Sequence, residues 1–303
     1  MINIKKYNCY YNNKEDKYYL DKSYPQKKSK DYCKQKKDSK TNVDHHLNIP
    51  YSQPRILNCV VYYVGEAAAK LEVPNFQLQG ARNFWGQHGI EIYISNSSSS
   101  GLITDSTLTS IFGNPEAAAG FNFPCGTALN PGANRNAEFE TLANKYSFWD
   151  IVNIYYLDFY RLDLLKDQKS EGPWTIGCCR NRYSISSDGT IRTRADIYIP
   201  IQPTPPAGFF PGAPHYEGNT ENQYTLAHEI GHALFFRQIN GNWSDANPSV
   251  NNQYGAAHDK RTNNLMNPSV PSKSPTLDQI QISTAQNSRL LRSTPILIQT
   301  NDD

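Results

Sequence analysis

The stretch TLAHEIGHALFFRQIN, residues 225–240, decides which fold the sequence predicts, because it carries two histidines and a glutamate as H-E-x-x-H. Thr220, with Gln223 three residues later, forms a capping box in front of this amphipathic stretch. Asn240, followed by a glycine, supplies a stop signal at the other end. The sequence therefore predicts a single helix over about residues 221–240.

Histidines four residues apart lie on one face of a helix, about one 5.4 Å turn from each other, so His228 and His232 can bind one metal ion. Glu229 projects about 100° away from His228, where it is too short to join the metal but can reach a water bound there. The alternative is two surface histidines on an ordinary helix. A chance H-E-x-x-H is expected in roughly half a per cent of chains of this composition, so the motif favours a metal site.

A catalytic zinc needs a third protein ligand, and the sequence limits where that ligand can come from. Glu229 is the last glutamate of the chain, so a glutamate from a later helix is excluded. His258 is the only histidine after His232. The downstream candidates for the third ligand are therefore His258 and the carboxylates Asp245, Asp259, Asp278, Asp302 and Asp303.

The segment GAAHDKRTNNLMNP, residues 255–268, contains a G-x-x-H that ends at His258, and Met266 follows eight residues later. Here the chain resembles the metzincin family of zinc peptidases, whose pattern is H-E-x-x-H-x-x-G-x-x-H followed by a turn with a methionine beneath the zinc. Relative to that pattern, about twenty residues are inserted before the glycine. The resemblance covers most of residues 55–293, weakly outside the motif, and includes NFWGQHGIEIYI and DIVNIYYLDFY, residues 83–94 and 150–160.

The resemblance implies a zinc endopeptidase that hydrolyses peptide bonds of a protein or peptide substrate. One catalytic Zn²⁺ would be held by His228, His232 and His258, with Met266 in the turn below. Glu229 would act as the general base on a zinc-activated water. In the family the substrate lies extended along an edge strand, which here would be TRADIYI, residues 193–199.

The alternative to a general endopeptidase is an effector or binding protein on a metzincin fold, with proteolysis that is latent or confined to one target. The segment GNWSDANPSVNNQY, residues 241–254, motivates this reading, because a polar loop there could cover the cleft. A third hypothesis is a zinc-stabilised module that binds nucleic acid through a lysine-rich tail.

Strand and helix patterns outside the motif predict an α/β fold, of the α+β zincin type that the resemblance implies. RILNCVVYYV, a helix on residues 75–89 ending at Gly89, and IEIYIS predict a β-α-β unit. We expect a mixed twisted sheet of about five strands, an active-site helix, and a C-terminal subdomain with a Met-turn and a helix. Further elements are predicted from apolar spacing: a helix in 136–148, strands in 150–160 and 189–200, and a helix in 274–291.

Charge is unevenly distributed along the 303 residues. Residues 1–48 contain 12 Lys and 6 Asp or Glu, which leaves 18 basic and 22 acidic residues for 49–303. We therefore expect a basic, partly disordered leader or propeptide at 1–48 and one catalytic domain at 49–303. The slightly acidic body argues against a nucleic-acid partner.

No apolar run approaches the roughly 18 residues that a membrane helix needs, so the sequence predicts no membrane span. The resemblance implies a protein that is secreted or delivered outside the producing cell, although the first residues lack the apolar stretch of a secretory signal. The oligomeric state stays open.

Six cysteines contain no C-x-x-C pair, which gives little support for a cysteine metal site. If the protein is exported, the sequence favours a bridge between Cys125 and either Cys178 or Cys179. Reduced thiols packed as small apolar residues are the alternative.

Overall fold

The computed structural model describes residues 9–12, 17–20, 55–65, 72–95, 101–112, 137–158, 177–201, 222–249, 252–253 and 257–296. The chain divides into two compact units, Met1–Ser52 and Gln53–Asp303. In the first unit, β1 (Cys9–Asn12) pairs antiparallel with β2 (Lys17–Leu20). Whether residues 1–48 act as a leader or propeptide stays a prediction.

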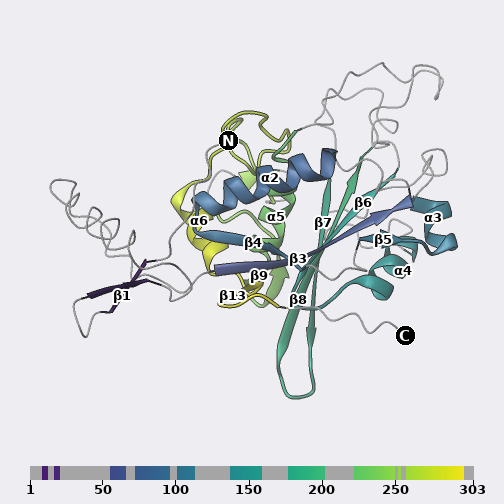
Figure 1. Ribbon diagram of the computed structural model, residues 1–303, viewed down its shortest axis with the longest axis horizontal. Coiled ribbons are helices and arrows are strands. Elements are labelled where there is room, and N and C mark those ends of the chain that lie inside the picture. Colours follow the sequence, from purple (N-terminus) through teal and green to yellow (C-terminus); the bar gives the residue numbers. More distant parts are fainter. Residues whose placement is uncertain are drawn as a thin grey trace. The chain divides into compact units, whose positions relative to one another are not determined.

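A seven-stranded mixed sheet forms the centre of the second unit (Figure 1). Its strands are β3 (Arg55–Val64), β4 (Ile90–Ile94), β5 (Leu102–Ile103), β6 (Val152–Leu157), β7 (Cys178–Ile185), β8 (Ile191–Pro200) and β13 (Leu291–Arg292). Strand β3 pairs in parallel with β4, β5 and β6, and β6 pairs in parallel with β8. The antiparallel pairs are β7 with β8 and β13 with β3. The protein is thus α/β with a mostly parallel mixed sheet. The sheet has seven strands where the sequence predicts about five, because β5 and β13 are only two residues long each. Strand β7 matches none of the strands that the sequence pattern indicates.

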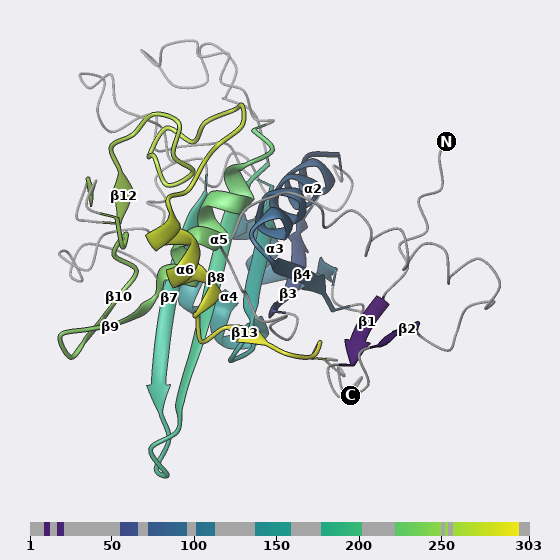
Figure 2. The same ribbon diagram turned by 90° about the vertical axis from the view of Figure 1, so that its left-hand side faces the viewer.

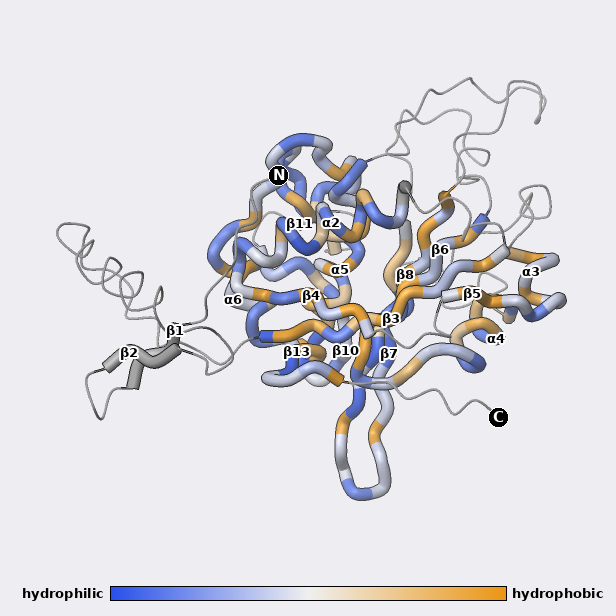
Figure 3. Tube along the Cα trace, in the orientation of Figure 1, coloured by the Kyte–Doolittle hydropathy of each residue, from blue (hydrophilic) through white to orange (hydrophobic). Residues whose placement is uncertain are grey.

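Helices cover both faces of this sheet in two apolar layers. One layer contains α2 (Glu72–Gln87), α5 (Thr225–Phe235) and α6 (Gln279–Gln286), and the other contains α3 (Ser106–Phe112) and α4 (Ala137–Tyr146). Because successive side chains of a strand point to opposite faces, Cys59 and Val61 of β3 pack in the first layer, and Val60 and Tyr62 pack in the second. Figure 3 shows hydrophobic residues along β3, β6 and β8, between the two layers.

The predicted β-α-β unit is confirmed as β3, α2 and β4. Gly89 has the left-handed φ of +74° that ends a helix, directly before β4 begins. From the buried face of α2, the Trp85 indole Nε1 donates a hydrogen bond to the Ala227 carbonyl of α5 at 3.1 Å. Phe76, near the start of the same helix, is 45% exposed. Helix α2 therefore fixes the position of α5.

Helix α5 is shorter than the predicted 221–240, and the predicted capping box does not cap it. Its N-cap is Tyr224, whose side chain makes no capping hydrogen bond, and Phe236 ends the helix in an extended conformation. Asn240 and Gly241 have φ values of +51° and +84°, and they form the two-residue turn between β9 (Arg237–Ile239) and β10 (Asn242–Ser244). Asn-Gly is a hairpin signal as well as a helix stop, and here it forms a hairpin.

The predicted edge strand TRADIYI lies inside the sheet, as β8 between β6 and β7. Its alternating polar residues suggest one exposed face, but Arg194 and Asp196 are buried, and Arg194 Nε lies 3.1 Å from Asp196 Oδ2. The end of the described strand order is β7. Figure 2 shows β7 and β8 as a long hairpin. This hairpin extends beyond β6, because β6 pairs with β8 only from Ala195 onward, whereas β7 pairs with it from Ile191.

Candidate metal site

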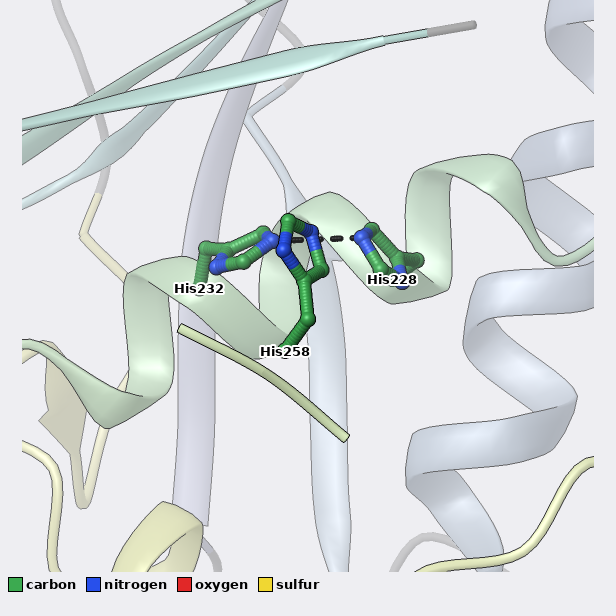
Figure 4. Close-up of side chains that lie close together, drawn as sticks. All are labelled: His228, His232 and His258. Carbon is green, nitrogen blue, oxygen red and sulfur yellow. Dashed lines mark hydrogen bonds between the residues drawn. The ribbon is translucent and has the colours of Figure 1, made fainter. Parts of the chain in front are cut away.

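Three histidine side chains from two separate segments meet beside α5. His228 and His232 come from α5, and His258 begins β12 (His258–Asp259), which pairs antiparallel with β11 (Asn252–Gln253). One ligand nitrogen from each ring lies within 4.8 Å of the other two (Figure 4). This group could hold a metal ion.

Two carboxylates that the sequence offers as alternatives to His258 do not join the cluster of ligand nitrogens. Asp259 is completely buried, and its Oδ2 lies 2.6 Å from Arg261 Nη2. Asp245 Oδ2 lies 3.1 Å from His232 Nδ1, the ring nitrogen that does not face the other histidines. The third ring in the cluster is that of His258.

The oxygens beside His228 and His232 determine which ring nitrogen of each histidine can bind a metal ion. His228 Nδ1 lies 2.7 Å from the Leu265 carbonyl oxygen, and His232 Nδ1 lies 3.1 Å from the Asp245 carboxylate. The Leu265 carbonyl oxygen can only accept a hydrogen bond, so in neutral His228 the hydrogen lies on Nδ1 and Nε2 presents a lone pair. The Asp245 carboxylate, paired with His232 Nδ1 at 3.1 Å, favours the same tautomer of His232. The two Nε2 atoms are 3.1 Å apart. Two lone pairs at that distance repel each other unless a proton or a metal ion lies between them.

The donor set fits a tetrahedral metal site. Zinc–nitrogen bonds of about 2.0–2.1 Å in tetrahedral geometry separate two ligand nitrogens by roughly 3.3 Å, close to the separation of the two Nε2 atoms. His258 Nδ1 is buried and has no hydrogen-bond partner among the described residues. Residues of this chain that would hold a metal are therefore His228, His232 and His258.

Burial keeps two of the three imidazoles neutral. It lowers the pKa of His228 well below its ordinary value, and it lowers the pKa of His258 to about 3. Burial alone would lower the pKa of His232 too, but the Asp245 carboxylate outweighs it and raises that pKa. Neutral imidazoles are the form that binds metal ions.

The Glu229 carboxyl is buried beside the histidines. Burial, with a smaller contribution from Asp245, raises the pKa of Glu229 to about 7, against the lowering effects of His232 and of the Cys179 backbone N–H. A Cβ added to Gly177, just before β7, would lie 2.9 Å from Glu229 Oε1. The start of β7 thus lies against this carboxyl, and glycine allows the close approach. Sequence reasoning missed Gly177, since a single glycine before a strand has many explanations.

Met266 packs directly on α5 at Gly231, the residue before His232. It is fully buried, and a Cβ added to Gly231 would lie 2.4 Å from its Sδ. The Met266 N–H donates to Asn264 Oδ1 at 2.9 Å, and its carbonyl accepts from the Asp259 N–H at 2.8 Å. The methionine turn therefore joins the strand that carries His258 to the helix that carries the other two histidines.

A buried polar network holds the segment around His258 in place. Its members are Asn247, Asp259, Arg261, Asn264, Asp278 and Gln281. Gln281 Nε2 donates to Asn247 Oδ1 at 2.9 Å, and Gln281 Oε1 accepts from Asn264 Nδ2 at 2.8 Å. Since these partners are distant in sequence, no local pattern could reveal the network.

The described cysteines of the second unit differ in their bonding state. Cys178 is disulfide-bonded, whereas Cys59 and Cys179 are free. Cys125, the predicted partner, lies outside the described residues.

A comparison with protein-family models finds no match, and a comparison with curated proteins finds none either. Among the described helices, none is both long and apolar enough to cross a membrane. The function must therefore be argued from the geometry of the site.

Proposed function

We propose that the protein is a zinc-dependent endopeptidase of the metzincin type. The observation that carries this proposal is the joint placement of three histidine nitrogens within 4.8 Å and a buried glutamate beside them on the same helix. Three imidazole ligands are typical of catalytic zinc, since they leave one coordination position open. A bound zinc ion would lower the pKa of a water in that position toward roughly 7 and polarise the carbonyl of a peptide bond.

Glu229 has the properties that a general base needs in this reaction. Its pKa of about 7 lets it take a proton from water near neutral pH and later give that proton to the leaving amine. The Cys179 N–H donates a hydrogen bond to its carboxylate, and the absence of a side chain at Gly177 leaves the space that the carboxylate occupies. The carboxyl is thus held in one place while it exchanges the proton.

Strand β7 supports an extended substrate better than β8 does. It ends the order of described strands, and its first residues lie against Glu229. A peptide could add to such an edge through backbone hydrogen bonds. The Asn181 side chain of β7 donates to the His232 carbonyl at 3.1 Å, which couples this edge to α5.

The Cys178 disulfide supports the proposal that the protein works outside the producing cell. Disulfides persist in oxidising compartments and are rare where thiols are kept reduced. Secretion is therefore proposed together with the peptidase activity.

The test compares zinc-loaded wild type with Glu229→Gln on a mixed peptide library, read by mass spectrometry. We expect wild type to cut, and Glu229→Gln to keep its zinc but lose about 10²–10⁴-fold in rate. Glu91→Gln is the matched control, because Glu91 is an exposed residue of β4 and its variant should cut like wild type. Equal cutting by Glu229→Gln would refute the assigned base. A zinc-loaded wild type that cuts nothing would instead favour the effector or binding protein.

A further inference from the structure

The segment between His232 and His258 places a carboxylate next to the histidine cluster. Asp245 directly follows β10, and its Oδ2 lies 3.1 Å from His232 Nδ1. His232 Nε2, on the other edge of the ring, is the atom that lies 3.1 Å from His228 Nε2. Asp245 therefore contacts the ring from the side opposite to the shared metal position.

We propose that Asp245 is a positioning residue for His232 and sets the metal affinity of the site. Because its carboxylate oxygen lies 3.1 Å from Nδ1, it favours the tautomer that carries its hydrogen on Nδ1 and turns its Nε2 lone pair toward His228. A carboxylate in this place also makes the imidazole a stronger electron donor to a metal. The inference needs the metal site but not peptidase activity, so it can fail separately from the proposed function.

The hairpin that carries Asp245 is anchored at both ends, so the carboxylate is held in a defined position. Arg237 Nη1 donates to the Phe235 carbonyl at 2.8 Å and to the Ala246 carbonyl at 2.7 Å, which ties the end of α5 to the residue after Asp245. On the hairpin itself, the Trp243 ring stacks on Tyr183 of β7 with a centroid distance of 5.1 Å. Both anchors therefore hold the chain within two residues of Asp245.

The other two histidines do not depend on a removable side chain in the same way. His228 Nδ1 is paired with the backbone carbonyl of Leu265, and His258 Nδ1 has no hydrogen-bond partner within the described part of the chain. His232 is thus the ligand whose orientation a single side-chain substitution can release. The consequence is measurable as metal affinity.

Zinc affinity, measured on the full chain by competition with a chelator, tests the inference. We expect Asp245→Ala to bind zinc about 10–100-fold more weakly than wild type. Asp245→Asn should lose less, because the amide oxygen can accept the same hydrogen without the charge, and its unchanged size protects the fold. Gln238→Ala is the control, since Gln238 is an exposed residue of the same hairpin and its variant should keep the wild-type affinity.

A second measurement reports the tautomer itself. Long-range ¹H–¹⁵N spectra of the metal-free protein at about pH 9, where imidazoles are neutral, should show the His232 hydrogen on Nδ1 in wild type. In Asp245→Ala the hydrogen should be shared between Nδ1 and Nε2. A purely structural role for Asp245 would leave this spectroscopic signature unchanged.

Three outcomes would overturn the inference. One is an Asp245→Ala protein that binds zinc within about twofold of wild type. Another is an equal loss of affinity in Gln238→Ala, which would assign the effect to the hairpin and not to the carboxylate. A wild type that takes up no zinc would overturn the inference together with the metal site, whereas a wild type that binds zinc but cuts no peptide would overturn the proposed function alone.

Discussion

A glycine in the middle of α5, the helix that carries His228 and His232, decides how closely Met266 can approach. A Cβ on Gly231 would lie 2.4 Å from Met266 Sδ and 3.2 Å from Met266 Cε, which is too short for a normal contact at the sulfur. Glycine weakens a helix by about 1 kcal/mol relative to alanine. The helix tolerates this loss here because the sulfur fills the space that a methyl group would occupy.

Gly231→Ala should lower the free energy of unfolding by about 1–3 kcal/mol, because the added methyl group overpacks the contact with Met266 by more than the helix gains. Urea denaturation measures the change. Gly86→Ala in α2 is the matched control, because an added Cβ there meets no atom within 4 Å and should stabilise the protein by up to about 1 kcal/mol. If both alanine variants are equally stabilised, Met266 does not pack on α5 as described.

Among the elements, α6 supports the metal site although it contributes none of the three histidines. Its N-cap Asp278 and Gln281 form a reciprocal capping box, with both hydrogen bonds at 2.9 Å. Asp278 Oδ2 also lies 2.9 Å from Arg261 Nη2, three residues after His258. The first turn of α6 therefore fixes the segment that delivers the third histidine.

Asp278→Ala should destabilise the protein by about 1–2 kcal/mol through loss of the cap, while Asp278→Asn, which still caps, should lose only the interaction with Arg261. Burial alone would raise the pKa of Asp278, but the Gln281 N–H, the Ser249 hydroxyl and Arg261 together lower it. The charge therefore stabilises the fold above the unfolded pKa and stops doing so as the pH falls through the lower, folded pKa.

Urea denaturation of wild type and Asp278→Asn at about pH 7 and about pH 3 checks this sign. The difference between the two proteins should be largest near neutrality and should shrink in acid. A difference that grows in acid would contradict the direction of the shift.

The β-α-β unit of β3, α2 and β4 was predictable from the sequence, whereas the place of β8 in the sheet and the contact of Asp245 with His232 were not. The apolar spacing of α2 and the left-handed Gly89 are local signals, and both agree with the structure. The position of β8 inside the sheet depends on the ion pair of Arg194 with Asp196, which lets charged residues be buried in an alternating pattern. Similarly, Asp245 could be assigned to His232 only after the Asn-Gly dipeptide was known to form a hairpin.

For the whole molecule, a bound metal would join α5 to the C-terminal segment and so stabilise the second unit. A ligand at 100 times its Kd adds about 2.7 kcal/mol, which for a unit of this size corresponds to roughly 5–10 °C in Tm. We expect a chelator to lower the Tm of the zinc-loaded protein by that amount. His258→Ala should abolish the response, whereas His88→Ala, outside the cluster, should keep it. If the chelator leaves the wild-type Tm unchanged, the metal does not contribute to the stability of the second unit.

The distance in sequence between the histidines has a consequence for the order in which the protein becomes active. His228 and His232 meet as soon as α5 forms, but His258 and the Leu265 carbonyl that orients His228 leave the ribosome later. The site is complete only when these residues and α6 have packed. A chain that has been synthesised only as far as α5 therefore lacks the third histidine, and the proposed peptidase stays inactive until the segment with His258 has been made and has packed.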